Sequence, residues 1–179
     1  SDTEMTSAIK TCNDNKVYLA QFFRVISQEN SADIYQAAKD SDYYIGAVHE
    51  DEPANGEQLV NILLNKGDRN IGLIGWEQGD ATWLGRWEGY KAGVDKWNEE
   101  HPDDQAKLSE PQYAGTTSEG GSKAAEALMA ADPNLDALIP AGGGGDPLQG
   151  AIAADERAGK HADIDIVSPY ILPDLGARL

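Results

Sequence analysis

Four consecutive glycines, Gly142–Gly145, follow an apolar segment and precede a segment with helical spacing. Consecutive backbone N–H groups at such a position can hold a phosphate group. The run lacks both the Gly-Lys-Ser/Thr ending of a P-loop and the spacing of a dinucleotide fingerprint, and Asp146 would place negative charge beside any phosphate. A flexible loop, or a loop that lets a ligand approach the backbone closely, is therefore favoured over a phosphate site.

The three histidines are scattered, and none has a metal-ligand spacing such as H-x-x-x-H. His49 stands beside Glu50 and Asp51 just after a predicted strand, where a general base or a metal ligand is conceivable. The favoured alternative is a charged loop whose carboxylates complement the positive end of the next helix. Because no nucleophile, base and orienting group come together, we expect a protein that is not an enzyme and that holds no metal or cofactor.

Aromatic and guanidinium side chains are the remaining candidates for a binding site. Trp76 and Trp83 flank a loop that follows a predicted strand, and they could stack against the C–H faces of a sugar. Trp87 and Trp97 recur at helical spacing, which is typical of packing between a helix and a sheet. Arg86 could bind hydroxyl or carboxylate groups of a ligand, or form a surface salt bridge, and its position alone does not separate the two.

Predicted strands and helices alternate along the chain. Short apolar segments predict the strands, and apolar residues at three- and four-residue steps predict the helices. The strands are expected at 17–23, 43–48, 71–75, 137–139 and 164–167, and helices at 82–100, 118–131 and 147–158, with another ending at Gly67. This alternation predicts an α/β fold with a three-layer, doubly wound, mostly parallel sheet, whose ligands bind at the carboxyl ends of the strands.

The charge balance restricts the partners. The chain has 31 acidic and 14 basic residues and a formal net charge of -17. Such a field repels the phosphates of nucleic acids, so we expect no nucleic-acid partner.

The order of segments resembles that of periplasmic sugar-binding proteins of the ribose-binding type. The resemblance runs through "EPANGEQLVNILL", "NIGLIG" and "GDATWLGRWEGYKAGV", and continues in "AAEALMAADPNLDALIPAGGGGDPLQGAIAADERAGK" and "DIDIVSPYILPDL". It implies a lobe of the type I periplasmic-binding-protein fold. Residues 1–41 would be a remnant of the N-terminal lobe, contributing a helix and a strand, and residues 42–179 would be the C-terminal ligand-binding lobe, truncated at its end. We therefore expect a fragment whose exposed interlobe surface forms a dimer contact.

Pocket positions carry over from this resemblance residue by residue. Arg24 and Arg86 match the pocket arginines, whereas Phe23, the glycine run and Tyr170 replace three polar partners of sugar hydroxyls. The resulting pocket would be more aromatic and would suit a modified sugar, a nucleoside or an aromatic solute. The expected ligand contacts are Phe23, Arg24, Trp76, Trp83, Arg86, Thr116, Gly144 and Tyr170.

The resemblance implies the solute-binding component of an ABC importer. Such a protein closes two lobes on a sugar or related small molecule, performs no chemistry, and presents its closed form to a membrane permease. Its location would be extracytoplasmic, either periplasmic or lipid-anchored at the cell surface. The alternative is the effector-binding domain of a lac-repressor-type transcriptional regulator, which shares the fold. The acidic surplus favours the exported receptor.

Overall fold

The structure, a computed structural model, describes residues 2–22, 26–29, 31–141, 146–160 and 163–169. The chain forms two compact units, Ser1–Asp51 and Glu52–Leu179. Within the described residues no helix has the length and apolar character needed to cross a membrane.

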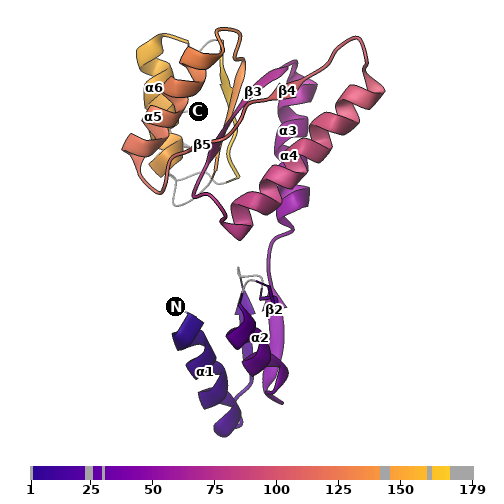
Figure 1. Ribbon diagram of the computed structural model, residues 1–179, viewed down its shortest axis with the longest axis vertical. Helices are drawn as coiled ribbons and strands as arrows, with labels where there is room; N and C mark the ends of the chain where they lie inside the picture. Colours follow the sequence, from indigo (N-terminus) through magenta and orange to yellow (C-terminus); the bar gives the residue numbers. More distant parts are fainter. Residues whose placement is uncertain (1, 23–25, 30, 142–145, 161–162, 170–179) are drawn as a thin grey trace. The chain divides into compact units, whose positions relative to one another are not determined.

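The first unit is a two-stranded parallel sheet with two helices. Its elements are α1 (Asp2–Asp14), β1 (Leu19–Phe22), α2 (Ala32–Lys39) and β2 (Tyr44–Val48) (Figure 1). Ile9 and Ile34 of the helices are buried, and Leu19 and Tyr44 of the strands pack against them. The alternate strand residues Phe22 and Ile45 are 71% and 69% exposed, so one face of this sheet is covered and the other is open.

The boundary between the units lies later than the sequence predicts. Residues 42–51 were expected to belong with the second lobe, but β2 pairs with β1, from Leu19 opposite Tyr44 to Phe22 opposite Val48. This pairing places the end of the first unit after Asp51. The apolar run that predicts a strand carries no information about which strand it will join, and the assignment of residue ranges to two lobes stays a prediction.

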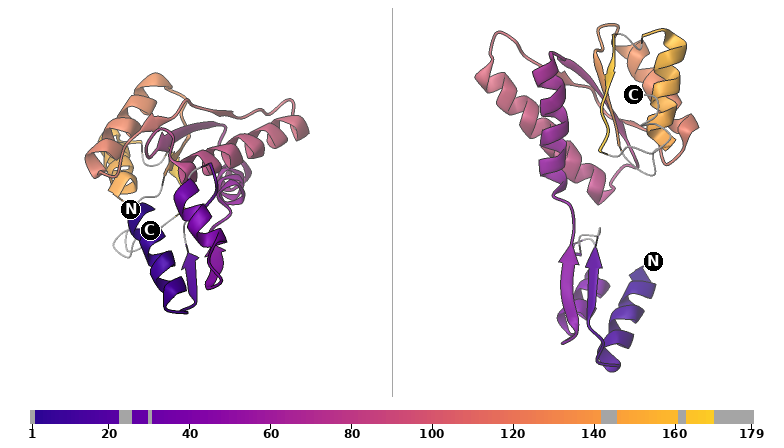
Figure 2. Two further views of the ribbon diagram at one scale, coloured as in Figure 1. Left: turned by 60° about the horizontal axis from the view of Figure 1, so that its bottom comes forward. Right: turned by 180° about the vertical axis from the view of Figure 1, so that it is seen from behind.

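The second unit has three layers, as predicted. Its helices are α3 (Glu52–Lys66), α4 (Ala81–Glu100), α5 (Ser118–Ala131) and α6 (Asp146–Ala158), and its strands are β3 (Asn70–Gly75), β4 (Lys107–Leu108), β5 (Gln112–Tyr113), β6 (Ala137–Pro140) and β7 (Asp165–Ile166). All described strands run parallel, in the order β4-β3-β6-β7 with β5 also beside β3. Figure 2 shows the helix pairs α3–α4 and α5–α6 on opposite sides of this sheet.

The alternation of side chains along β3 divides the core in two. Ile71 and Leu73 lie in the cluster beneath α3 and α4. Ile74 lies in the cluster beneath α5 and α6. Because successive strand residues point to opposite faces, a strand buried on both faces must be apolar throughout, which is the pattern that predicted it.

Glycines bring the helices of each pair close together. A Cβ atom on Gly89 of α4 would lie 2.0 Å from the carbonyl oxygen of Pro53 on α3, and one on Gly150 of α6 would lie 1.9 Å from the carbonyl oxygen of Ser118 on α5. No side chain fits at either contact. Each pair therefore packs backbone against backbone on its face of the sheet.

The helix ends follow the sequence signals. The Thr117 side chain accepts a hydrogen bond from the N–H of Gly120 at 3.0 Å, and Asp80 caps α4 in the same way through the N–H of Trp83 at 2.8 Å. Gly67 and Gly159 follow α3 and α6 with φ of 120° and 68°, where a residue with a side chain would be strained. The helix end predicted at Gly67 is confirmed.

The edge strand beside β3 was not predicted, because it is short and interrupted. The residue pairs of β4 and β5 form no apolar run, and Pro111 between them has no N–H to donate. At the interruption the Ser109 hydroxyl accepts a hydrogen bond from the N–H of Leu73 at 2.9 Å. A side chain thus replaces the backbone acceptor that a continuous strand would supply.

Candidate ligand-binding site

The chain connections of the second unit point to one edge of its sheet. The connection after β3 runs through α4 on one face to the edge strand, and the connection after β6 runs through α6 on the other face to β7. In open α/β sheets, ligands bind outside the carboxyl ends of two adjacent strands whose connections diverge in this way. The candidate site is therefore the carboxyl edge where β3 ends at Gly75 and β6 ends at Pro140.

Two predicted site residues lie in neighbouring loops at this edge. Trp76 directly follows β3 and is half-buried against the core beneath α3 and α4. Thr116 is exposed in the turn before α5. The N–H of Gly115 donates to the carbonyl oxygen of Trp76 at 2.9 Å, which ties the two loops together. The structure thus brings an indole and a hydroxyl side chain to one edge from positions far apart in the sequence.

Trp83 is a core residue in the first turn of α4 rather than an open stacking surface. It is 1% exposed and lies among three aromatic rings. Its indole stacks on Trp87 with centroids 6.3 Å apart, meets Tyr113 edge to face at 6.4 Å, and tilts against Tyr90 at 6.0 Å. Trp83 is therefore packed inside the protein, and its role as a ligand contact stays a prediction.

Arg86 is held in a buried ion pair. The guanidinium is 2% exposed, and its Nε and Nη2 donate to the two carboxylate oxygens of Glu52 at 2.5 and 3.2 Å. A salt bridge was one of the two readings of Arg86, but it was expected on the surface. This forked contact instead fixes the first turn of α3 to α4 and neutralises the guanidinium charge beneath the edge.

Tyr90 lies one turn beyond Arg86 on α4 and is fully buried. Burial raises the pKa of the Tyr90 phenol, and the nearby Arg86 charge opposes this shift only in part. The phenol therefore stays neutral across the physiological range and does not serve as a base.

The other predicted contacts, Phe23, Arg24, Gly144 and Tyr170, lie outside the described residues. Their roles in ligand binding stay predictions. His49 is exposed, and its Nδ1 lies 2.9 Å from the carbonyl oxygen of Glu50. Among the described residues, no group of three or more His, Cys, Asp or Glu side chains is arranged to hold a metal ion.

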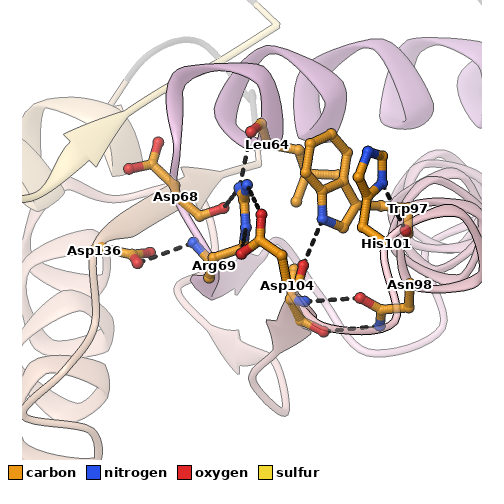
Figure 3. A network of polar contacts seen from close by, with 9 residues as sticks. Leu64, Asp68, Arg69, Trp97, Asn98, His101, Asp104 and Asp136 are labelled. Atoms are coloured by element: carbon orange, nitrogen blue, oxygen red, sulfur yellow. Dashed lines mark hydrogen bonds and ion pairs between the residues drawn. The ribbon is translucent and has the colours of Figure 1, made fainter.

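A polar network occupies the opposite, amino-terminal edge of the sheet. Arg69 precedes β3 and donates to the Asp104 carboxylate at 2.9 and 2.6 Å, while the Trp97 indole N–H donates to the carbonyl oxygen of Asp104 at 2.8 Å (Figure 3). The Trp97 ring also contacts Arg69, whose Cζ is 4.4 Å from its centroid, and stacks on His101 at 3.9 Å. This clasp closes the connection from α4 to β4, and it gives Trp97 the packing role predicted for it.

Three carboxylates gather at the same amino-terminal edge. Asp136 accepts hydrogen bonds from the N–H groups of Arg69 and Asn70 at 2.9 and 2.8 Å. Burial, together with the charges of Asp165 and Asp136, raises the pKa of Asp68 to about 6, although Lys66 opposes the shift. Repulsion between like charges therefore adds to the effect of burial on Asp68, at an edge that carries no predicted ligand contact.

Comparison with known proteins identifies the fold. No protein-family model matches the chain, and no curated protein matches it. Solved structures do match. An ABC transporter solute-binding protein from Agrobacterium vitis with bound D-fucose is 16% identical, with a TM-score of 0.66 over 91% of this chain and 51% of that one. A periplasmic solute-binding protein from Actinobacillus succinogenes with bound D-allose is 15% identical, with a TM-score of 0.67 over 93% and 62%.

A transcriptional regulator matches to a similar degree. The sugar-binding regulator of the LacI family from Escherichia coli, complexed with phosphate, is 20% identical, with a TM-score of 0.70 over 93% of this chain and 62% of that chain. The chain spans about half to two thirds of the length of these proteins. It has the type I periplasmic-binding-protein fold, as the resemblance in sequence implied.

Proposed function

We propose that this chain belongs to the solute-binding component of an ABC importer and that it binds a sugar or related small molecule without chemistry. The carrying observation is the fold shared with solute-binding proteins that hold D-fucose and D-allose, joined to the meeting of Trp76 and Thr116 at the carboxyl edge. The protein would act outside the cytoplasm and deliver its ligand to a membrane permease. Residues 1–51 would be part of one lobe and residues 52–179 part of the other.

The described residues suit a neutral, hydroxyl-rich ligand. A partly exposed indole such as Trp76 can lie against the C–H face of a sugar, and the Thr116 hydroxyl can both donate and accept a hydrogen bond. Glu52 already balances the charge of Arg86, so an anionic ligand would gain little at this position. The proposed further contacts are Phe23, Arg24, Gly144 and Tyr170, together with Trp83 and Arg86.

A thermal-shift screen of the full chain tests the proposal. We expect D-fucose, D-allose or a related sugar to raise the unfolding midpoint in a concentration-dependent way, because a ligand that binds only the folded state stabilises it. Trp76→Ala should abolish the shift. Trp97→Ala is the matched control, because Trp97 is also half-buried against the same core but lies in the clasp at the opposite edge. A screen in which no sugar stabilises the chain would reject sugar binding.

The effector-binding domain of a LacI-type regulator is the second candidate, supported by the match to the Escherichia coli regulator. Both candidates bind a small effector, so the sugar screen does not separate them. The 5′ coding sequence of the native gene does. A secretory or lipoprotein signal supports the receptor, whereas a helix-turn-helix segment supports the regulator.

A further inference from the structure

The indole N–H of Trp83 is a buried donor without a partner. Within the part of the chain that the structure describes, its Nε1–H donates to no hydrogen-bond acceptor. Trp97 shows the usual arrangement, because its N–H donates to the carbonyl oxygen of Asp104 at 2.8 Å. An unmet buried donor destabilises a folded protein, so a native chain that keeps one calls for a physical reason.

The position of this donor supplies a reason. The ring atom Cε2, which is bonded to Nε1, lies 2.9 Å from the place where a Cβ on Gly75 would stand. Gly75 ends β3 and directly precedes Trp76, and its carbonyl oxygen accepts a hydrogen bond from the N–H of Ala114 at 3.0 Å. The unpaired N–H therefore lies at the carboxyl edge, where the diverging strand connections place the ligand.

Protein rings pack against the Trp83 indole, whereas its N–H has no partner among the described residues. The indole lies among Trp87, Tyr90 and Tyr113, and its atom Cε2, next to Nε1, shares with the Tyr113 ring the space that a side chain at Gly75 would take. We infer that Trp83 determines ligand specificity by donating a hydrogen bond from Nε1 to an acceptor oxygen of the ligand, such as a sugar hydroxyl or ring oxygen. Because the atom is buried in the free chain, the bond forms only when the ligand moves part of the edge. This inference rests on the proposed sugar binding.

Substitution and spectroscopy of the full chain test this role together. Trp83→Phe keeps an aromatic ring and removes the donor, and Trp97→Phe does the same at a donor that is already satisfied. With D-fucose and D-allose as probes, we expect Trp83→Phe to weaken the affinity about tenfold or more, since a lost hydrogen bond leaves the ligand oxygen unpaired. Trp97→Phe should leave the affinity unchanged.

The indole ¹⁵N–H spectrum gives a second measurement that does not depend on the folding of one variant. The chain has four tryptophans, so the Trp83 signal is identified by its loss in Trp83→Phe or by elimination through the other three. We expect that signal to move downfield when the sugar is added, while the signal of Trp97, whose N–H is already bonded to Asp104, stays in place. Equal affinity of Trp83→Phe and wild type, together with an unmoved Trp83 signal, would overturn the donor role and leave sugar binding intact. A bond from Trp83 Nε1–H to an internal water that persists when sugar is bound would do the same. If the wild-type chain binds neither sugar, the proposed function is rejected, and the donor role with it.

Discussion

Asp68→Asn should stabilise the protein at neutral pH, because Asp68 lies close to Asp136 and Asp165 in a buried setting. The pKa of Asp68 is raised to about 6 from an ordinary value of 3.8. The folded state therefore binds a proton more tightly than the unfolded state does. Stability from this group is present below the ordinary pKa, falls as pH rises toward 6, and stays at its lower level above that.

The size of the effect follows from the shift in pKa. A raised pKa of this extent corresponds to about 3 kcal/mol of unfolding free energy at pH 7, and partial hydration of the carboxyl reduces it to roughly 1–3 kcal/mol. Asparagine keeps the shape and removes the charge, so Asp68→Asn should recover much of this at pH 7 and little at pH 4. Surface carboxylates such as Asp104, whose pKa is lowered by Arg69, stabilise the fold more as the pH rises. They are present in both the variant and the wild type, so their effect cancels in the difference between the two.

Urea denaturation from pH 4 to pH 8 measures the difference between the variant and the wild type. We expect this difference to grow between pH 4 and 6 and then level off. Asp104→Asn is the control of opposite sign: Arg69 lowers the pKa of Asp104, so this variant should be less stable than wild type at neutral pH. A variant that is less stable than wild type at pH 7, or a difference that is flat with pH, would show that Asp68 is not strained by its neighbours.

Three further outcomes are expected. Gly89→Ala should lower the unfolding free energy by about 1–3 kcal/mol in urea, because its Cβ meets the Pro53 carbonyl, whereas a stabilised variant would mean that α3 and α4 separate freely. Arg86→Ala should lower the unfolding free energy by about 3–5 kcal/mol, because it leaves the Glu52 carboxylate buried without its partner. Glu52→Gln should lower it by less, and equal losses for the two variants would contradict this interpretation of the buried ion pair. At high concentration, light scattering should detect dimers that Phe22→Ser disrupts, since that side chain lies on the open face of the first unit; monomers throughout would remove the dimer contact.

Local sequence signals predicted the elements that depend on neighbours in the chain. The apolar spacing of α4 and the helix end at Gly67 both act within one or two helical turns, so the sequence contains them directly. The strands β4 and β5 exist only because β3 lies beside them, and neither has an apolar run of its own. Their prediction would have required the sheet order in advance.

The candidate site shows the same limit. The carboxyl edge followed from the alternation of strands and helices, and it selected the loop that begins at Trp76, whose contact with a ligand stays a prediction. The partner of Arg86 did not follow, because Glu52 lies 34 residues away and no spacing relates the two. The aromatic side chain of Trp83 suggested stacking in a pocket, yet its neighbours Trp87 and Tyr113 come from a helix turn and an edge strand that meet only in the folded chain.

The interruption between β4 and β5 also bears on how copies of this protein meet during folding. A long, unbroken edge strand is a template on which another chain can add a strand, and repeated addition leads to fibrils. Here Pro111 has no N–H to donate, and the Ser109 hydroxyl turns inward to the N–H of Leu73. An incoming strand would find only two-residue stretches in register with β3, too short to hold it. The interrupted edge strand thus protects the sheet against strand addition at the edge opposite β7.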